Sequence, residues 1–115
     1  MAQPQHKSQW RKVCNLAALV PDSGVAALLQ GQQIALFYLP AEEPVIYALD
    51  NWDPIGQANV LSRGIVGDLG GDLVVASPLY KQHFKLRDGA CLEQQETRVR
   101  TWPVRVVGDT VEVLM

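Results

Sequence analysis

Short apolar segments alternate along the chain with clusters of Gly, Pro, Asn and Asp. Residues 34–39, 45–49 and 73–76 are almost continuously apolar, which is typical of strands that are covered on both faces. Near the carboxyl end, residues 104–107 and 111–114 flank a Gly-Asp-Thr turn and predict a closing hairpin. Frequent turn signals between short β-rich segments favour a sandwich or barrel, so the sequence predicts an all-β fold.

One segment could form a helix instead. Residues 15–20 contain good helix formers, but Pro21 follows them directly, so we expect no more than a single turn. The 115 residues, 48% of them hydrophobic, suit one compact domain. We expect residues 1–8, which are mostly polar, to form a flexible tail, and residues 9–115 to form a single domain.

The net charge of −2 gives the chain no general attraction to nucleic acid or to anionic lipid. The amino end lacks the apolar run of a secretory signal, and no later apolar stretch is long enough to cross a bilayer. Residues 98–105 interleave basic and aromatic side chains, a pattern that can bind single-stranded nucleic acid, but such alternation is also typical of a solvated strand face. We therefore expect a cytoplasmic protein with neither a nucleic-acid nor a membrane partner.

Few side chains offer metal or redox chemistry. Cys14 and Cys91 are far apart and lack the paired spacing of a zinc site or a disulfide framework, so we expect two reduced, half-buried thiols. His83 is the only histidine outside the first eight residues, and a lone imidazole is more often a surface or hairpin residue than a metal ligand. No glycine-rich stretch has the spacing of a phosphate loop.

Two proline-containing turns in the middle of the chain are similar to the loops of a known domain. Asp53-Pro54-Ile55 follows one predicted strand, and Ser77-Pro78-Leu79-Tyr80 follows another. Residues 47–92 resemble a Rieske domain, in which a C-P-H loop and a C-P-x-H loop bind a two-iron cluster. The resemblance implies a Rieske-like antiparallel β-sandwich or partial barrel, with a small inserted two-loop subdomain over residues 50–85 or so.

All four positions that correspond to cluster ligands are substituted. The cysteine positions hold Asp53 and Ser77, and the histidine positions hold Ile55 and Tyr80, while Pro54 and Pro78 still shape the loops. A Rieske centre needs two thiolates on one iron and two imidazoles on the other, so we expect no bound cluster and no other metal.

The residues that replace the ligands indicate a more specific family within the Rieske-like proteins. Asp53-Pro-Ile, the Ser77 loop and residues 60–68 between them are similar to the small subunits of assimilatory NAD(P)H-dependent nitrite reductase, as is nearly the whole chain from Trp10 onward. In that family FAD, a 4Fe-4S cluster and sirohaem reduce nitrite to ammonium in a separate large subunit. The resemblance therefore implies an accessory subunit of an oxidoreductase in nitrate assimilation, with the large subunit as its partner and no catalysis by the isolated chain.

Two further interpretations concern the loops themselves. Asp50 and Asp53 could act as a carboxylate pair in acid–base chemistry, but Asp, Asn and Pro together are more often a turn. The loop tips are rich in apolar and aromatic residues, and we expect Ile55 and Tyr80 to point inward. We expect Trp52, with Leu79, to face a protein partner.

Two alternative functions remain open from the sequence. One is a Rieske-type ferredoxin that carries electrons with unusual cluster ligation. The other is a non-redox protein-binding module on the same scaffold, since a fold does not fix a function.

Overall fold

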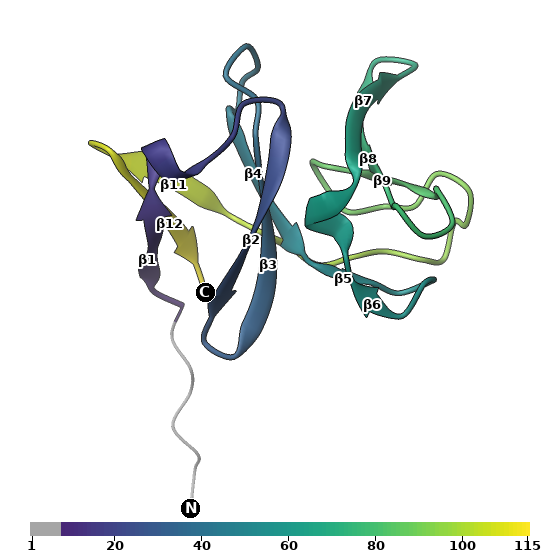
Figure 1. Cartoon of the computed structure of the whole chain (residues 1–115), viewed down its shortest axis with the longest axis horizontal. Coiled ribbons are helices and arrows are strands. Elements are labelled where there is room, and N and C mark those ends of the chain that lie inside the picture. Colours follow the sequence, from purple (N-terminus) through teal and green to yellow (C-terminus); the bar gives the residue numbers. More distant parts are fainter. Residues whose placement is uncertain (1–7) are drawn as a thin grey trace, which may run out of the picture.

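The structure is a computed structural model that describes residues 8–115 (Figure 1). Within this range the chain is built from strands and two one-turn 3-10 helices. In chain order these are β1 (Trp10–Asn15), η1 (Leu16–Ala18), β2 (Ser23–Leu29), β3 (Gln32–Tyr38), β4 (Ile46–Asp50), β5 (Trp52–Asp53), β6 (Ala58–Asn59), η2 (Leu61–Arg63), β7 (Ile65–Leu69), β8 (Asp72–Ala76), β9 (His83–Lys85), β10 (Thr101–Trp102), β11 (Val104–Val107) and β12 (Thr110–Leu114).

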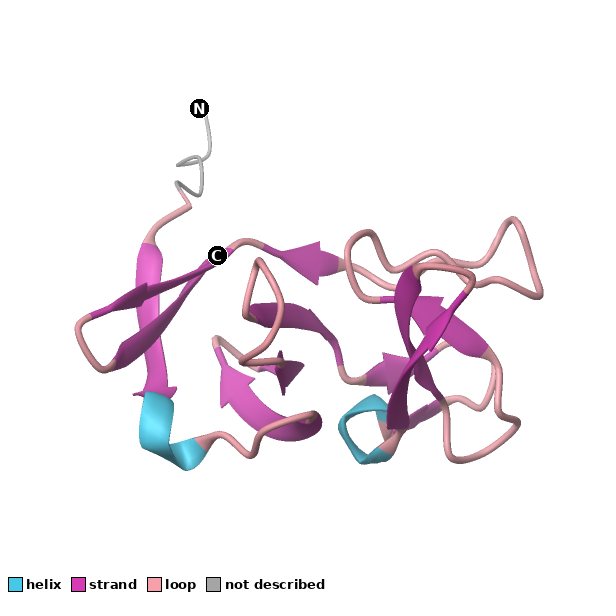
Figure 2. Cartoon of the chain, turned by 90° about the horizontal axis from the view of Figure 1, so that it is seen from above, coloured by secondary structure: helices cyan, strands magenta, loops and turns pink. Residues whose placement is uncertain are grey.

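The strands form four antiparallel sheets. A four-stranded sheet in the order β10-β4-β3-β2 occupies the centre of the molecule, and a three-stranded sheet β1-β12-β11 packs on one side of it (Figure 1). On the other side lies a lobe made of the sheet β7-β8-β9 and the short pair β5-β6, as the view from above also shows (Figure 2).

The central strands are apolar on both faces because each face covers a different core. Along β3, Ile34 and Leu36 belong to the core shared with β1, β11 and β12, while Ala35 and Phe37 belong to the core shared with the lobe. This division follows from the strand period of two, which sends successive side chains to opposite faces. The continuous apolar runs in the sequence thus have a direct structural cause.

Several predictions about secondary structure are confirmed. The three apolar segments overlap β3, β4 and β8 to within two residues at each end, and the closing hairpin is formed by β11 and β12. The predicted helical turn is the single 3-10 turn of η1. Of the predicted tail, residues 1–7 lie outside the described part of the chain. No helix among residues 8–115 has the length and apolar character to cross a membrane.

Candidate functional site

Two loops of the lobe meet at their tips. The first loop connects β5 to β6, and the second spans residues 77–82 between β8 and β9. Their contact is tight at Gly56, because a Cβ placed on this glycine would collide with Cδ1 of Leu79 and would lie 3.0 Å from an Asp53 carboxylate oxygen. Gly56 is therefore a position where the second loop leaves no space for a larger side chain.

The two loops have the same backbone turn. In the first loop, the carbonyl of Asp53 accepts a hydrogen bond from the Gln57 N–H at 2.7 Å, and in the second the carbonyl of Ser77 accepts one from the Lys81 N–H at 3.0 Å. Gln57 and Lys81 both have a left-handed backbone, with φ of 57° and 61°. Each turn thus begins with a polar residue followed by proline and ends four residues later in the same strained conformation.

The first side chain of each turn also accepts a hydrogen bond from the residue two positions later. Oδ1 of Asp53 accepts from the Ile55 N–H at 2.8 Å and from the Gly56 N–H at 3.0 Å. Oγ of Ser77 accepts more weakly from the Leu79 N–H at 3.3 Å. The backbone of each loop therefore directs N–H groups at the first side chain of the turn, two in the first loop and one in the second.

Asp53 and Ser77 bond directly to each other. The Ser77 hydroxyl donates to Oδ2 of Asp53, and the two residues are 0% and 1% exposed. Both carboxylate oxygens of Asp53 are thus satisfied within the protein, as a buried carboxylate requires. The interpretation of Asp53 as a turn residue is confirmed. Asp50 has a separate partner, since its Oδ1 accepts a hydrogen bond from Nε1 of Trp102 at 3.3 Å.

The residues in these loops do not fit a Rieske cluster. Asp53 and Ser77 stand where the two thiolates of a Rieske centre would bind one iron, but they offer only oxygen atoms, and these atoms are hydrogen-bonded to each other. Ile55 has no donor atom and packs against the lobe core, which confirms its expected inward position. No group of three or more His, Cys, Asp or Glu side chains in residues 8–115 is arranged to hold a metal ion.

The expectation that Tyr80 points inward is wrong. Tyr80 is 65% exposed. Leu79, the residue before it, packs on Gly56 and takes the space between the two tips, which leaves the phenol ring outside. Trp52 is 45% exposed, which confirms that it faces outward, and Leu79 keeps a partly exposed edge.

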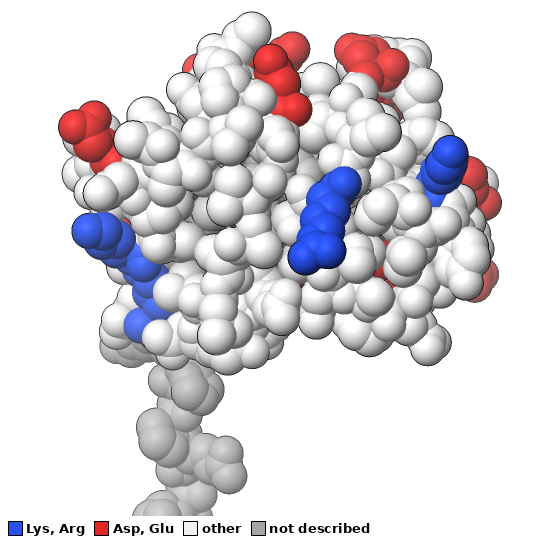
Figure 3. All heavy atoms as spheres, in the orientation of Figure 1, with Lys and Arg blue, Asp and Glu red and all other residues white. Residues whose placement is uncertain are grey.

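Trp52, at the start of β5, and Leu79 and Tyr80, in the second loop, are exposed, and we refer to these three side chains together as the apolar tip surface. Exposed large apolar and aromatic side chains are a feature of protein-binding sites. In Figure 3 the charged side chains are scattered over the visible face and form no broad patch of one sign. The tip surface therefore suits a protein partner better than a polyanion.

Asn51 is a supporting residue that the sequence did not reveal. It is buried, its Oδ1 accepts a hydrogen bond from the Ser62 N–H at 2.7 Å, and its Nδ2 donates to Gln33 at 3.2 Å. Asn51 thereby joins β3, the start of β5 and η2 at the base of the first loop. Its position beside Asp50, Asp53 and Pro54 made it look like one more turn residue.

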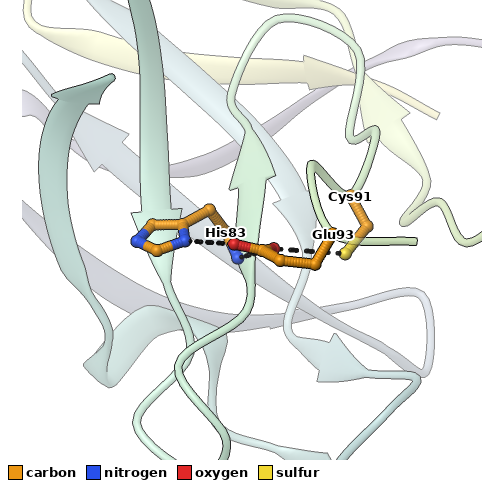
Figure 4. A network of polar contacts seen from close by, with 3 residues as sticks. All are labelled: His83, Cys91 and Glu93. Carbon is orange, nitrogen blue, oxygen red and sulfur yellow. Dashed lines mark hydrogen bonds and ion pairs between the residues drawn. The ribbon is translucent and has the colours of Figure 1, made fainter. Parts of the chain in front are cut away.

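A polar cluster lies beside the second loop, where His83 begins β9 (Figure 4). Nδ1 of His83 lies 2.6 Å from Oε2 of Glu93, and the His83 N–H donates to Oε1 of the same carboxylate at 2.8 Å. Sγ of Cys91 lies 3.7 Å from Oε1. Partial burial acts to raise the pKa of Glu93, but the hydrogen bonds and the charge of His83 outweigh it and lower the pKa below its ordinary value.

The two cysteines are free thiols, as expected. Cys14 is half-buried on β1, whereas Cys91 is fully buried in the lobe core, which is deeper than the sequence indicated. Burial raises the pKa of Cys14 and disfavours its thiolate. In the basic segment, Trp102 is buried and the guanidinium of Arg100 stacks on its indole at 3.8 Å, so the ring is not free to stack on a base.

Comparison with known proteins shows which family has this sequence and fold. The Rieske-like [2Fe-2S] domain family matches residues 9–114. The chain is 41% identical to the nitrite reductase (NADH) small subunit of Salmonella typhimurium, covering 92% of this chain and 97% of that protein. The solved structure of the Escherichia coli protein NirD is similar, with a TM-score of 0.84 and 38% identity over 94% of this chain and 97% of that one.

A further relative is much longer than this chain. The nitrite reductase [NAD(P)H] large subunit of Klebsiella oxytoca is 47% identical over 104 residues, which are 90% of this chain but only 11% of that protein. A segment similar to this chain is thus part of a large-subunit polypeptide.

Proposed function

The chain belongs to the Rieske-like domain family and to the small subunits of NAD(P)H-dependent nitrite reductase, and on this basis we propose that it is the accessory small subunit of such a complex. It acts in an oxidoreductase that converts nitrite to ammonium, and it binds the large subunit. The isolated chain has no catalytic residue of its own in this proposal.

The observation that carries this proposal is the Klebsiella oxytoca large subunit, which includes a segment 47% identical to this chain. When two polypeptides of one system are joined in another, their domains are held at high effective concentration, which suits domains that work in contact. We therefore infer that the separate chain associates with its own large subunit and that residues 9–115 act as one docking domain.

We propose that the loops of residues 50–85 are the remnant of a cluster-binding subdomain. Asp53, Ile55, Ser77 and Tyr80 stand at the former ligand positions, and Pro54 and Pro78 retain the loop shape. Because these side chains lack the thiolates and imidazoles of a Rieske centre, we infer that the chain binds no cluster. FAD, a 4Fe-4S cluster and sirohaem then belong to the large subunit, and the complex is cytoplasmic.

The chain contributes a rigid binding surface. The hydrogen bond between Ser77 and Asp53 fixes the two loops relative to each other, and Gly56 lets Leu79 pack between them. Trp52, Leu79 and Tyr80 are then presented in one arrangement before the partner arrives, which lowers the entropy lost on binding. We propose that this apolar tip surface docks on the large subunit.

Reconstitution of the two purified subunits tests the accessory role. We expect the large subunit to lose NAD(P)H-driven nitrite turnover when this chain is omitted and to regain it when the chain is added. Full turnover by the large subunit alone would overturn the proposal. Iron and sulfide analysis of anaerobically purified chain tests the absence of a cluster, and stoichiometric iron would favour a Rieske-type ferredoxin instead.

Substitution tests the tip surface. We expect Trp52→Ala to weaken binding to the large subunit by about tenfold or more, since central aromatic residues contribute most to interfaces. Leu28→Ala is a matched control, because Leu28 is a strongly exposed apolar residue on β2 outside the two loops. Equal affinities for the two variants would count against docking through the tips.

A further inference from the structure

His83 lies on the outer face of the lobe sheet, next to the second loop. Across this sheet Ala76 pairs with Ile65 on one side and with His83 on the other, so the three side chains stand on the same face. Ile65 is 77% exposed, and His83 is partly exposed. The loop that carries Leu79 and Tyr80 joins Ala76 to His83, so this row borders the apolar tip surface.

Glu93 fixes the orientation of the His83 side chain. One carboxylate oxygen accepts the backbone N–H of His83, and the other contacts Nδ1 of its ring. The carbonyl of His83 also accepts the Leu92 N–H at 2.9 Å, which anchors the segment carrying Glu93 against β9. With Nδ1 engaged, the remaining ring nitrogen, Nε2, is left for an external partner. Such fixed orientation favours a directional hydrogen bond, because little side-chain entropy is lost when it forms.

The charged groups near the imidazole come from the segment that carries Glu93, from β8 and β9, and from the adjoining loop. Glu93 is the anion in direct contact, and the Cys91 thiol lies on the far side of this carboxylate. Lys85, two residues along β9 on the same face, is paired with Asp72 of β8 at 3.5 Å, which reduces its repulsion of an imidazolium. Lys81 is the cation of the adjoining loop. An imidazolium next to Glu93 would donate through Nδ1 to the carboxylate and through Nε2 to a second acceptor.

We propose that His83, oriented by Glu93, is a proton-dependent contact with the large subunit, donating from Nε2 to an acceptor oxygen of that partner. The inference rests on the proposed function, since it takes the large subunit as the occupant of the adjoining tip surface. Imidazole changes charge near neutral pH, so deprotonation converts Nε2 from a donor to an acceptor. Two facing acceptors repel, and the complex is therefore weaker at higher pH.

The test is the dissociation constant of the two purified subunits between about pH 5 and pH 8, the range in which histidine ordinarily titrates. For the wild-type chain we expect the Kd to rise with pH by about tenfold, the change that corresponds to one pKa unit of differential protonation. His83→Gln keeps a donor near the Nε2 position but does not titrate, so we expect its Kd to change less than about twofold over this range. His6→Gln, which removes the other histidine, is the matched control and should behave as the wild type does.

Glu93→Gln provides a second variant that retains the imidazole. Glu93→Gln removes the carboxylate that orients the ring, so we expect its Kd to be several-fold higher than that of the wild-type chain at about pH 5. A wild-type Kd for Glu93→Gln at that pH, or the wild-type rise retained in His83→Gln, would overturn the inference. If the wild-type Kd does not change with pH, the inference is overturned but the proposed function stands. If the two subunits form no complex at any pH, the proposed function itself is refuted.

Discussion

The hydroxyl of Ser77 donates a hydrogen bond to the carboxylate of Asp53, and this buried contact joins two loops that have the same backbone turn. Each of the two residues opens its turn and accepts an N–H from the residue two positions later. In a Rieske domain a metal cluster connects the corresponding loops. In this chain a side-chain hydrogen bond makes the connection, so the loops can keep their shape without a metal.

We predict that Asp53→Ala lowers the free energy of unfolding by about 3 kcal/mol, because it leaves two backbone N–H groups and a buried hydroxyl without their partner. Ser77→Ala should cost about 2 kcal/mol, since it removes the hydroxyl that donates to a buried carboxylate and that weakly accepts the Leu79 N–H. Urea unfolding of the isolated chain measures both. Asp68→Ala is a matched control: Asp68 also accepts a backbone N–H in a turn, but it is exposed, so its loss should cost less. A loss for Asp68→Ala as large as that for Asp53→Ala would contradict this account.

Periodicity and turn chemistry predicted most of the fold. The runs that became β3, β4 and β8 were recognisable because both faces of each were apolar, and Gly108 with Asp109 indicated the last hairpin. The shared backbone turn of the loops was less evident, because a left-handed conformation at Gln57 and Lys81 has no strong signal in residue type. The sequence therefore located the loops but did not reveal their equivalence.

Side-chain direction in the loops was predicted only in part. Ile55 and Trp52 point as expected, but Tyr80 does not, because Leu79 competes for the same space and Gly56 admits the smaller aliphatic group. The contact between His83 and Glu93 joins residues that are ten positions apart, at no spacing that marks a motif. Contacts of this kind depend on how one loop folds over another and cannot be deduced from local pattern.

We predict that Cys14 reacts slowly with iodoacetamide at neutral pH compared with an unstructured thiol. Burial raises the pKa of Cys14, so a smaller fraction is present as the reactive thiolate. The rate should continue to rise with pH beyond the range in which a free peptide thiol levels off. Mass spectrometry of the native chain follows the reaction, and Cys14→Ser identifies any contribution from Cys91. Alkylation of Cys14 as fast as that of a model peptide would contradict the prediction.

We predict that Glu93 contributes to the loss of stability in acid. Its pKa in the folded chain is lowered by His83, so the unfolded chain binds the proton more tightly. The stabilising effect is therefore present above the pKa of the unfolded state and is lost as the pH falls through the lower, folded value. Glu93→Gln should show a shallower decline in urea midpoint over this acidic range. The effect should be small because the carboxylate is partly exposed. If the urea midpoints of the wild-type chain and Glu93→Gln fall equally with decreasing pH, the prediction is wrong.

The contact between Gly56 and Leu79 allows the coupling of the two loops to be measured. We predict that Gly56→Ala lowers the free energy of unfolding by about 1–3 kcal/mol, since the added methyl would overlap the Leu79 side chain. Leu79→Ala removes most of that overlap, so the double variant should be more stable than the sum of the single effects implies. Gly67→Ala is the matched control, because a Cβ at Gly67 meets no atom within 4 Å. The affinity for the large subunit can be measured for the same two single variants and the double variant. Those affinities would show whether the packing of the loop tips, and not only the stability of the fold, determines binding. Additive effects in both measurements would mean that the loops act independently.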